Sequence, residues 1–303
     1  MRVRLAAIFL LLAALPLRAD YREFKDRPLD PSIQSKLQHA ADDILKQYPK
    51  LTADNLAMTV VDVTMPSAIG RGDYHGDAPF YPASVVKLFF MTEIFHQKLE
   101  TMPDVGRALH EMITVSDNDA TAFILDVFPD TSSGLPLEGR ALNTFLDKRA
   151  VANKWFNSMG YDISAMAKPW SFGPFGRDVQ VVGPNRERRN RATSNAVASL
   201  MLWIERRRAV SKEASDAMMN LLSRPLDPLR KEENQVKEFL GESLPAGSKL
   251  WSKAGWTSEV RHDAAYIEFP GGKKYVVVVF TRGTADDVTL LPAIGKRLWP
   301  ELQ

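Results

Sequence analysis

The sequence predicts an α/β (α+β) fold in which an antiparallel sheet is flanked by N- and C-terminal helices and carries an inserted all-helical domain. Strand-like apolar runs gather towards the two ends of the chain, while the patterns between about residues 103 and 224 are mainly helical. Such a chain closes best if its ends build one sheet and its middle folds as a helical layer. We expect a sheet domain over 20–82 and 245–303, a helical domain over 83–244, and a cleft between them.

Length and composition allow a large core and give no case for nucleic acid binding. The 303 residues are 45% hydrophobic, and 39 basic against 37 acidic side chains leave a net charge of +2. Cysteine is absent from the sequence, which excludes disulfides, a cysteine nucleophile and thiolate metal sites. The histidines have no metal-ligand spacing, so we expect no metal and no cofactor. They are His39, His75, His96, His110 and His262.

The first 19 residues have the pattern of a secretory signal peptide. Met1–Arg4 is cationic, Leu5–Leu17 is apolar, and Ala19 supplies a small residue at the cleavage position. The apolar stretch, interrupted by Pro16, is short for a membrane span. We expect cleavage after Ala19 and a periplasmic or secreted protein. Leu17 is unusual three positions before the cut, so an uncleaved anchor is the alternative.

A helix and two strands are expected next. Asp30 and Pro31 are a good cap and first-turn pair, and apolar residues follow at helical spacing as far as about Pro49. Residues 57–63 have the pattern of a strand, with 70–74 as its hairpin partner. Directly after them, the apolar run from Pro82 to Met91 predicts a helix that starts at a proline.

The rest of the chain divides into a helical block and a strand block. Spacings of three and four predict helices over 108–113, 120–128, 142–159, 195–207 and 213–222. Between 168 and 192 the periodicity fails, which predicts a long loop of the kind that often carries function. Strands are expected over 249–253, 263–269 and 275–281, with Gly271–Gly272 as a turn, and a last helix over about 287–298. The apolar run 276–280 does not alternate, so we expect that strand to be covered on both faces.

A serine and a lysine lie one helical turn apart in the run Ser84-Val85-Val86-Lys87. This spacing puts the Ser84 hydroxyl and the Lys87 amine on one helix face. A serine nucleophile needs a base within reach, and a lysine can serve if burial or a second cation lowers its pKa. Taken alone, the motif fits an ordinary buried helix better, with Lys87 reaching solvent.

Two further motifs follow, Ser116-Asp117-Asn118 and Lys253-Ala254-Gly255. Separately, the first suits a turn or helix cap and the second a strand that ends at a glycine. The order S-x-x-K, S-D-N, K-T-G is typical of penicillin-recognising serine enzymes. From about Ala57 to Val279 the chain therefore resembles the class A β-lactamase-like serine hydrolases. The resemblance implies the fold of serine β-lactamases and penicillin-binding proteins.

The resemblance also implies a role for each matching residue. Ser84 would attack the carbonyl carbon with Lys87 as its base, and Ser116 would pass a proton to the leaving nitrogen. Asn118 would hold a substrate amide, and Lys253 with Arg261 or His262 would bind the substrate carboxylate. Backbone N–H groups of Ser84 and Trp256 would form the oxyanion hole. The expected substrate-binding residues are Asn118, Lys253, Gly255, Trp256, Thr257, Arg261 and His262.

Three departures from the family pattern bear on activity. Ala254 replaces a hydroxyl residue, which should weaken carboxylate binding unless Thr257 substitutes. Only 32 positions separate Ser84 from Ser116, so the cleft should be more open. The loop has no E-x-x-L-N run, and Trp170 occupies the place of the deacylating glutamate. A penicilloyl ester should therefore persist, with Glu187 and Asp178 as weak substitutes.

These observations predict an exported, monomeric serine hydrolase that acts on a β-lactam or a related amide by acyl transfer. Two alternatives remain open at this point. One is a D-Ala-D-Ala peptidase or esterase, for which an open cleft suits a larger peptidoglycan-derived substrate. The other is a covalent β-lactam or cell-wall sensor, which needs acylation without turnover. The sequence assigns no role to the arginines between Arg186 and Arg191.

Overall fold

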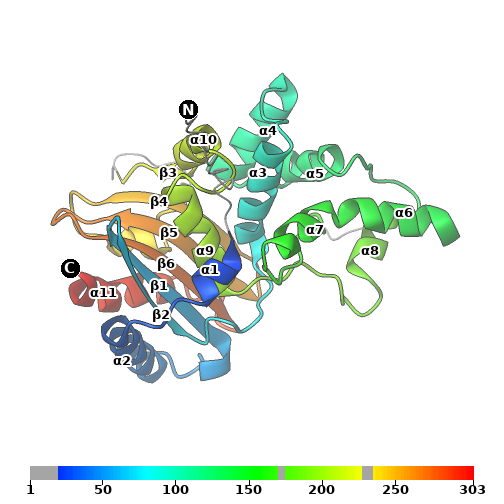
Figure 1. Ribbon diagram of the computed structural model, residues 1–303. Coiled ribbons are helices and arrows are strands. Elements are labelled where there is room, and N and C mark those ends of the chain that lie inside the picture. Colours follow the sequence, from blue (N-terminus) through cyan, green and yellow to red (C-terminus); the bar gives the residue numbers. More distant parts are fainter. Residues whose placement is uncertain (1–19, 170–174, 227–234) are drawn as a thin grey trace, which may run out of the picture.

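Six strands form one antiparallel sheet within residues 20–169, 175–226 and 235–303, which the computed structural model describes (Figure 1). Their order across the sheet is β2-β1-β6-β5-β4-β3. The strands are β1 (Leu56–Met65), β2 (Ala68–Tyr74), β3 (Ser223–Arg224), β4 (Lys249–Trp256), β5 (Val260–Glu268) and β6 (Lys274–Arg282). Because β1 pairs directly with β6, the two ends of the chain share one sheet, as predicted.

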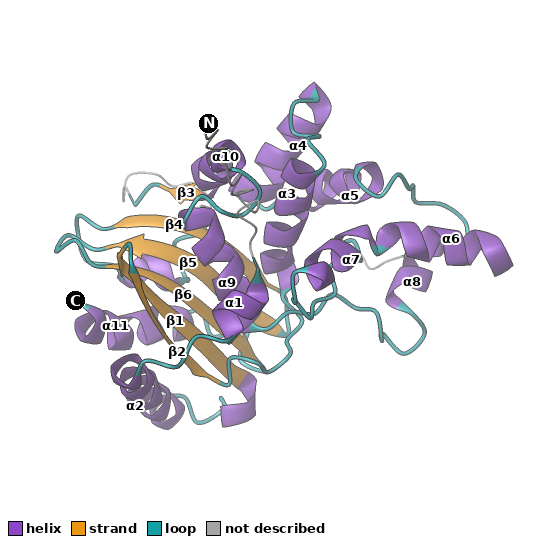
Figure 2. Ribbon diagram, in the orientation of Figure 1, coloured by secondary structure: helices purple, strands orange, loops and turns teal. Residues whose placement is uncertain are grey.

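The sheet has helices on both faces (Figure 2). On one face lie α2 (Pro31–Gln47) and α11 (Leu290–Leu302), whose apolar residues share a core with alternate side chains of the strands. On the other face lie α1 (Tyr21–Lys25) and α9 (Ser194–Glu205). Strand β6 is central, and Val276 to Phe280 are all fully buried. The expectation of a strand covered on both faces is confirmed.

The remaining helices form a layer beside the sheet. Its centre is α3 (Lys87–His96), in which the nine residues from Lys87 to Phe95 are all buried. The helices around it are α4 (Pro103–Thr114), α5 (Asn118–Val127), α6 (Gly139–Arg149), α7 (Val151–Ser158), α8 (Arg177–Val182) and α10 (Lys212–Leu222). Short 3₁₀ turns are η1 (Ala53–Asn55), η2 (Ala83–Val86) and η3 (Leu240–Ser243). The predicted α/β class with a helical layer is thus confirmed.

Several element boundaries differ from the prediction. The Ser84 segment begins as the 3₁₀ turn η2, and the α-helix starts only at Lys87. The helix expected over 142–159 is two helices that break at Ala150, where neither glycine nor proline marks the break. Helix α8 lies inside the expected loop 168–192, and six residues are too few for a clear periodic signal. Within 83–244, β3 and α9 pack with the sheet.

The described residues contain no helix that combines the length and apolar character needed to cross a membrane. The predicted signal peptide, residues 1–19, lies outside the described residues.

Candidate active site

Three separate segments bring two lysines to one hydroxyl group. The Lys87 amine, on α3, donates to the Ser116 carbonyl oxygen at 2.6 Å and to Asn118 Oδ1 at 2.9 Å, and it lies 3.2 Å from Ser116 Oγ. The Lys253 amine, on β4, donates to the same Ser116 Oγ at 2.9 Å. The Ser116 hydroxyl therefore lies between two amines, so a proton can move through it in either direction.

The turn that carries Ser116 is held by its own sequence. Asp117 caps α5, since its side chain accepts a hydrogen bond from the Ala120 N–H at 2.6 Å. Ser116 itself has φ 63°, a left-handed conformation that is costly for a serine. In this conformation both its carbonyl and its hydroxyl contact Lys87. Asp117 is thus structural, and Ser116 and Asn118 are the members of the motif whose side chains contact Lys87.

Burial tunes both lysines towards the neutral form. Lys87 is fully buried, and loss of hydration lowers the pKa of its amine to about 7, although Asp117 opposes this shift. Burial also lowers the pKa of the Lys253 amine, and the positive charges of Lys87 and Arg224 lower it further. An amine that is unprotonated near neutral pH can act as a general base.

Ser84 lies at the start of this cluster and remains open to a ligand. It is partly exposed, whereas Ala83 and Val85 on either side of it are buried. Ala83 has φ 45°, so the turn leading into the serine is strained. In the part of the chain that the structure describes, the Ser84 hydroxyl has no hydrogen-bond partner. The Lys87 amine contacts the Ser116 turn instead, so it must release one of those oxygens before it can take a proton from Ser84.

Gly255 lets β4 approach the Ser84 turn closely. A Cβ atom at Gly255 would lie 2.8 Å from the Ser84 nitrogen and 2.9 Å from the Pro82 oxygen and from the Val85 nitrogen. A side chain there would force the two segments apart. The contact places the end of β4 against the Ser84 N–H group, which an oxyanion hole shared by Ser84 and Trp256 requires.

His262, expected to bind the substrate carboxylate, belongs to the fold instead. Its ring is fully buried: Nδ1 accepts from the Thr281 N–H at 3.1 Å, and Nε2 donates to the Tyr81 carbonyl at 2.9 Å. Burial lowers the pKa of the imidazole to about 4, so the ring is neutral at ordinary pH. That prediction is wrong for His262, whose role is to join β5 to the segment before Ser84.

Arg261 points to the face of the sheet opposite Lys253, because neighbouring strand residues alternate between faces. Its guanidinium donates to the Ala285 carbonyl at 3.1 Å, pairs with Glu238 at 3.5 Å and lies over the Phe239 ring. The structure therefore does not bring Arg261 to the Ser116 hydroxyl. The expectation that Arg261 binds the substrate carboxylate has no support in this arrangement.

The other predicted binding residues lie at the end of β4. Trp256 is 43% exposed and packs against Phe239 with 5.5 Å between ring centres. The Thr257 hydroxyl accepts from the Glu259 and Val260 N–H groups, which leaves its own hydrogen available to a ligand. Thr257 also lines a cavity of about 520 Å³ with Tyr81 and part of the loop 168–192. Of these lining residues, Tyr81 comes three positions before Ser84 in the sequence, and Thr257 directly follows Trp256.

Gln235, which no sequence motif indicates, contacts Lys253. The Gln235 side-chain oxygen accepts from the Lys253 amine and, at 3.0 Å, from the Ala254 N–H. Gln235 lies after β3 and before η3, in a segment without periodicity, and a single glutamine is not part of any motif. No feature of the sequence marked it.

Neither of the acidic residues proposed as substitutes in the loop is available as a base. Asp178 is 2% exposed and forms an ion pair with the fully buried Arg149 at 3.1 Å. Glu187 pairs with Arg188 at 2.8 Å and accepts from the Asn185 N–H. Trp170, at the position of the family's glutamate, lies outside the described residues.

The arginines from 186 to 191 are mainly structural. Arg188 donates to the carbonyls of Gln180 and Val181, and Arg191 pairs with Asp162 at 2.6 Å. Arg189 lies 3.6 Å over the Tyr81 ring and pairs with Glu259 at 3.3 Å. Arg189 thus joins the loop to the turn that follows β4, across the cavity near Thr257.

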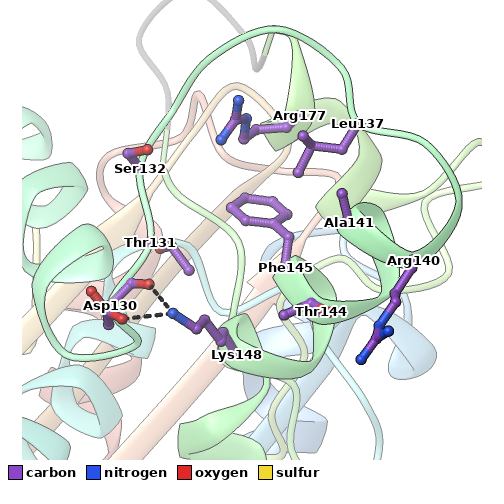
Figure 3. A pocket seen from close by; sticks show the side chains of 10 residues that line it. All are labelled: Asp130, Thr131, Ser132, Leu137, Arg140, Ala141, Thr144, Phe145, Lys148 and Arg177. Atoms are coloured by element: carbon purple, nitrogen blue, oxygen red, sulfur yellow. Dashed lines mark hydrogen bonds and ion pairs between the residues drawn. The ribbon is translucent and has the colours of Figure 1, made fainter.

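A second cavity, of about 660 Å³, lies in the helical layer and contains none of the predicted site residues. Figure 3 shows Phe145 in its centre and Lys148 bonded to Asp130 at its edge. In the described residues no three His, Asp or Glu side chains are grouped to hold a metal ion.

The pattern of the Beta-lactamase enzyme family matches residues 98–302, which include Ser116 and Lys253 but begin after Ser84. No curated protein matches the chain.

Solved structures share the fold at low identity. A mutant of PBP-A, solved as an acyl-enzyme complex with penicillin G, is 18% identical with a TM-score of 0.65, over 90% of this chain and 98% of that one. A beta-lactamase from Sphaerobacter thermophilus is 20% identical with a TM-score of 0.60, over 86% and 95%. A class A beta-lactamase representative from Bacteroides cellulosilyticus is 16% identical with a TM-score of 0.61, over 88% and 98%.

Proposed function

Because the chain belongs to the Beta-lactamase enzyme family, we propose that it is an exported serine hydrolase that transfers the acyl group of a β-lactam or a related amide to Ser84. The observation that carries the proposal is the Ser116 hydroxyl held between the buried amines of Lys87 and Lys253. Two amines in one buried site favour loss of a proton from one of them. That supplies the base that a serine nucleophile needs.

Acylation proceeds in two steps that balance in protons. Ser84 Oγ bonds to the carbonyl carbon while the neutral Lys87 amine takes the hydroxyl proton, and N–H groups of Ser84 and Trp256 stabilise the oxyanion. The Ser116 hydroxyl then gives its proton to the leaving nitrogen as the C–N bond breaks. Ser116 recovers a proton from a lysine ammonium, and Ser84 is left as an ester.

Penicillin G is the natural probe, because a protein of similar fold forms an acyl-enzyme with it. Hydrolysis of the ester needs a base that activates water. Asp178 and Glu187 are engaged by Arg149 and Arg188, which favours a slow second step. A covalent binder without turnover is therefore the second candidate function. Export is proposed because residues 1–19 have the pattern of a signal peptide.

Nitrocefin should give a burst of one product per protein molecule followed by little turnover. The first product appears as Ser84 is acylated, and the ester then persists because neither Asp178 nor Glu187 is free to activate water. Rapid-mixing absorbance at several protein concentrations measures this, since the burst must scale with protein. Fast steady turnover would show that a base other than Asp178 and Glu187 acts in deacylation. Release of D-alanine from a muropeptide would favour the peptidase alternative.

Acylation should slow as the pH falls below about 7, because the pKa of the Lys87 amine lies there. Below that pH the amine is protonated and cannot accept the Ser84 proton, so the rate falls about tenfold per pH unit. The second-order rate of penicillin labelling, measured from about pH 5 to 9, tests this. A rate that stays constant down to pH 5 would exclude Lys87 as the base. A Lys98→Met variant, changed at an exposed lysine in the turn between α3 and α4, should keep the wild-type profile.

A further inference from the structure

Gln235 connects two walls of the site by four hydrogen bonds. Its Nε2 group donates to the carbonyls of Ile113 at 3.0 Å and Thr114 at 2.9 Å, which end α4 just before the Ser116 turn. Its Oε1 atom accepts from the Lys253 amine and from the Ala254 N–H on β4. One side chain thus contacts both the end of α4, which leads into the Ser116 turn, and the Lys253 amine, which bonds to the Ser116 hydroxyl.

The surroundings of Gln235 make this connection rigid. The residue is 6% exposed, so water competes little for its hydrogen bonds. Arg224 reinforces the same junction, since its guanidinium donates to the Ile113 carbonyl at 2.8 Å and to the Ser252 carbonyl at 2.8 Å. Gln235 also has φ 54°, a strained conformation that the four hydrogen bonds hold in place.

The chemistry of an amide suits this position. The charged groups that act on the Lys253 amine are Lys87 from α3, Arg224 from β3 and Asp263 from β5. A glutamine orients the amine without adding a charge to this balance. A carboxylate in its place would add a negative charge that stabilises the protonated forms of the lysines and so raises the pKa of the Lys253 amine.

We propose that Gln235 is a positioning residue for acyl transfer, which fixes the Lys253 amine on the Ser116 hydroxyl by tying β4 to the end of α4. The inference depends on the proposed function, because the relay through Ser116 gives the position its purpose. Gln235 itself touches neither Ser84 nor, in this mechanism, the reacting atoms.

Two variants at one position test the proposal, with a third as control. Gln235→Met keeps the side-chain size and removes all four hydrogen bonds. Gln235→Glu keeps an acceptor for Lys253 and adds a charge. Gln34→Met is the matched control, because the Gln34 side chain likewise bonds a backbone N–H and a carbonyl, both of Asp73, on the far sheet edge. Penicillin acylation rates over pH and thermal stability are measured for each.

Gln235→Met should acylate about 10- to 100-fold more slowly than wild type, whereas Gln34→Met should acylate at the wild-type rate. Gln235→Glu should move the acidic limb of the acylation profile to higher pH by about one unit, because the added charge favours protonated lysines. If both Gln235 variants, once folded, kept the wild-type acylation rate and the wild-type position of the acidic limb, the proposal would be overturned. Gln235 would then be a purely structural residue.

A measurement without substrate separates this inference from the proposed function. In protein with ¹⁵N-labelled lysine, NMR follows the titration of the Lys253 amine, which is assigned by its loss in Lys253→Arg. Gln235→Glu should raise the pKa of that amine, and Gln34→Met should not change it. If wild type is never acylated, the proposed function fails, while an unmoved Lys253 titration in Gln235→Glu contradicts the contact itself.

Discussion

Ser84→Ala should abolish covalent labelling by penicillin. Removal of the hydroxyl removes the only atom that the proposed mechanism bonds to the substrate, so the label should fall to background at any pH. The substitution should leave the fold intact, because Ser84 is partly exposed and its hydroxyl has no partner in the described chain. We expect the free energy of unfolding to change by less than about 0.5 kcal/mol.

The control for this variant is Ser67→Ala, at an exposed position in the turn between β1 and β2. It should be labelled at the wild-type rate. In-gel fluorescence of a fluorescent penicillin after denaturation measures both variants. If Ser84→Ala were labelled as well as Ser67→Ala, another residue would be the nucleophile and the proposed mechanism would fail.

Gly255→Ala should have the second largest effect. The new Cβ would lie 2.8 Å from the Ser84 nitrogen and so force η2 and β4 apart. Displacing one oxyanion donor costs about 10²- to 10³-fold in rate. The same clash should lower the free energy of unfolding by about 1–3 kcal/mol, as overpacking does elsewhere.

Gly271→Ala provides the control, because a Cβ there would meet no atom within 4 Å. It should leave both acylation and stability at wild-type values. The rate of penicillin labelling and urea unfolding measure the two effects separately. Normal acylation by a destabilised Gly255→Ala would show that the close approach of β4 serves folding and not the oxyanion hole.

Much of the site could be predicted because its motifs are short and local. Ser84 with Lys87, and Ser116 with Asn118, are each fixed by spacings of two or three residues. Lys253 could be added because the order of the three motifs is itself informative. The order predicts that the three motifs meet in one pocket, and in the structure the Lys87 and Lys253 amines both contact the Ser116 hydroxyl. The approach of the Ser84 hydroxyl to Lys87 stays a prediction.

Arg261 and His262 could not be told apart from sequence. Adjacent strand residues point to opposite faces, so at most one of them could face Lys253. In an amphipathic strand the hydrophobic alternation would decide which, but β5 is buried at every position from Val260 to Ile267. With both faces covered, the pattern carries no information about orientation. Only the pairing with β4 in the folded chain shows which residue shares a face with Lys253. There His262 lies opposite Gly255, two residues after Lys253.

The elements that sequence reasoning missed are short or irregular. Strand β3 has two residues, and its place beside β4 follows from the sheet edge rather than from local preference. Gln235 gains its importance from contacts with Ile113 and Lys253, which are more than a hundred and about twenty positions away. Such contacts leave no local pattern, since polar residues in loops are common whether or not they act.

The most direct test of the central claim is the intact mass of the protein followed over time after addition of benzylpenicillin, with digestion to locate the adduct. We predict a gain of one penicilloyl group per chain, located on the peptide that contains Ser84, which forms faster above pH 7 than below and decays slowly. An adduct on any other peptide, or no adduct at a pH where Lys87 is neutral, would contradict the account.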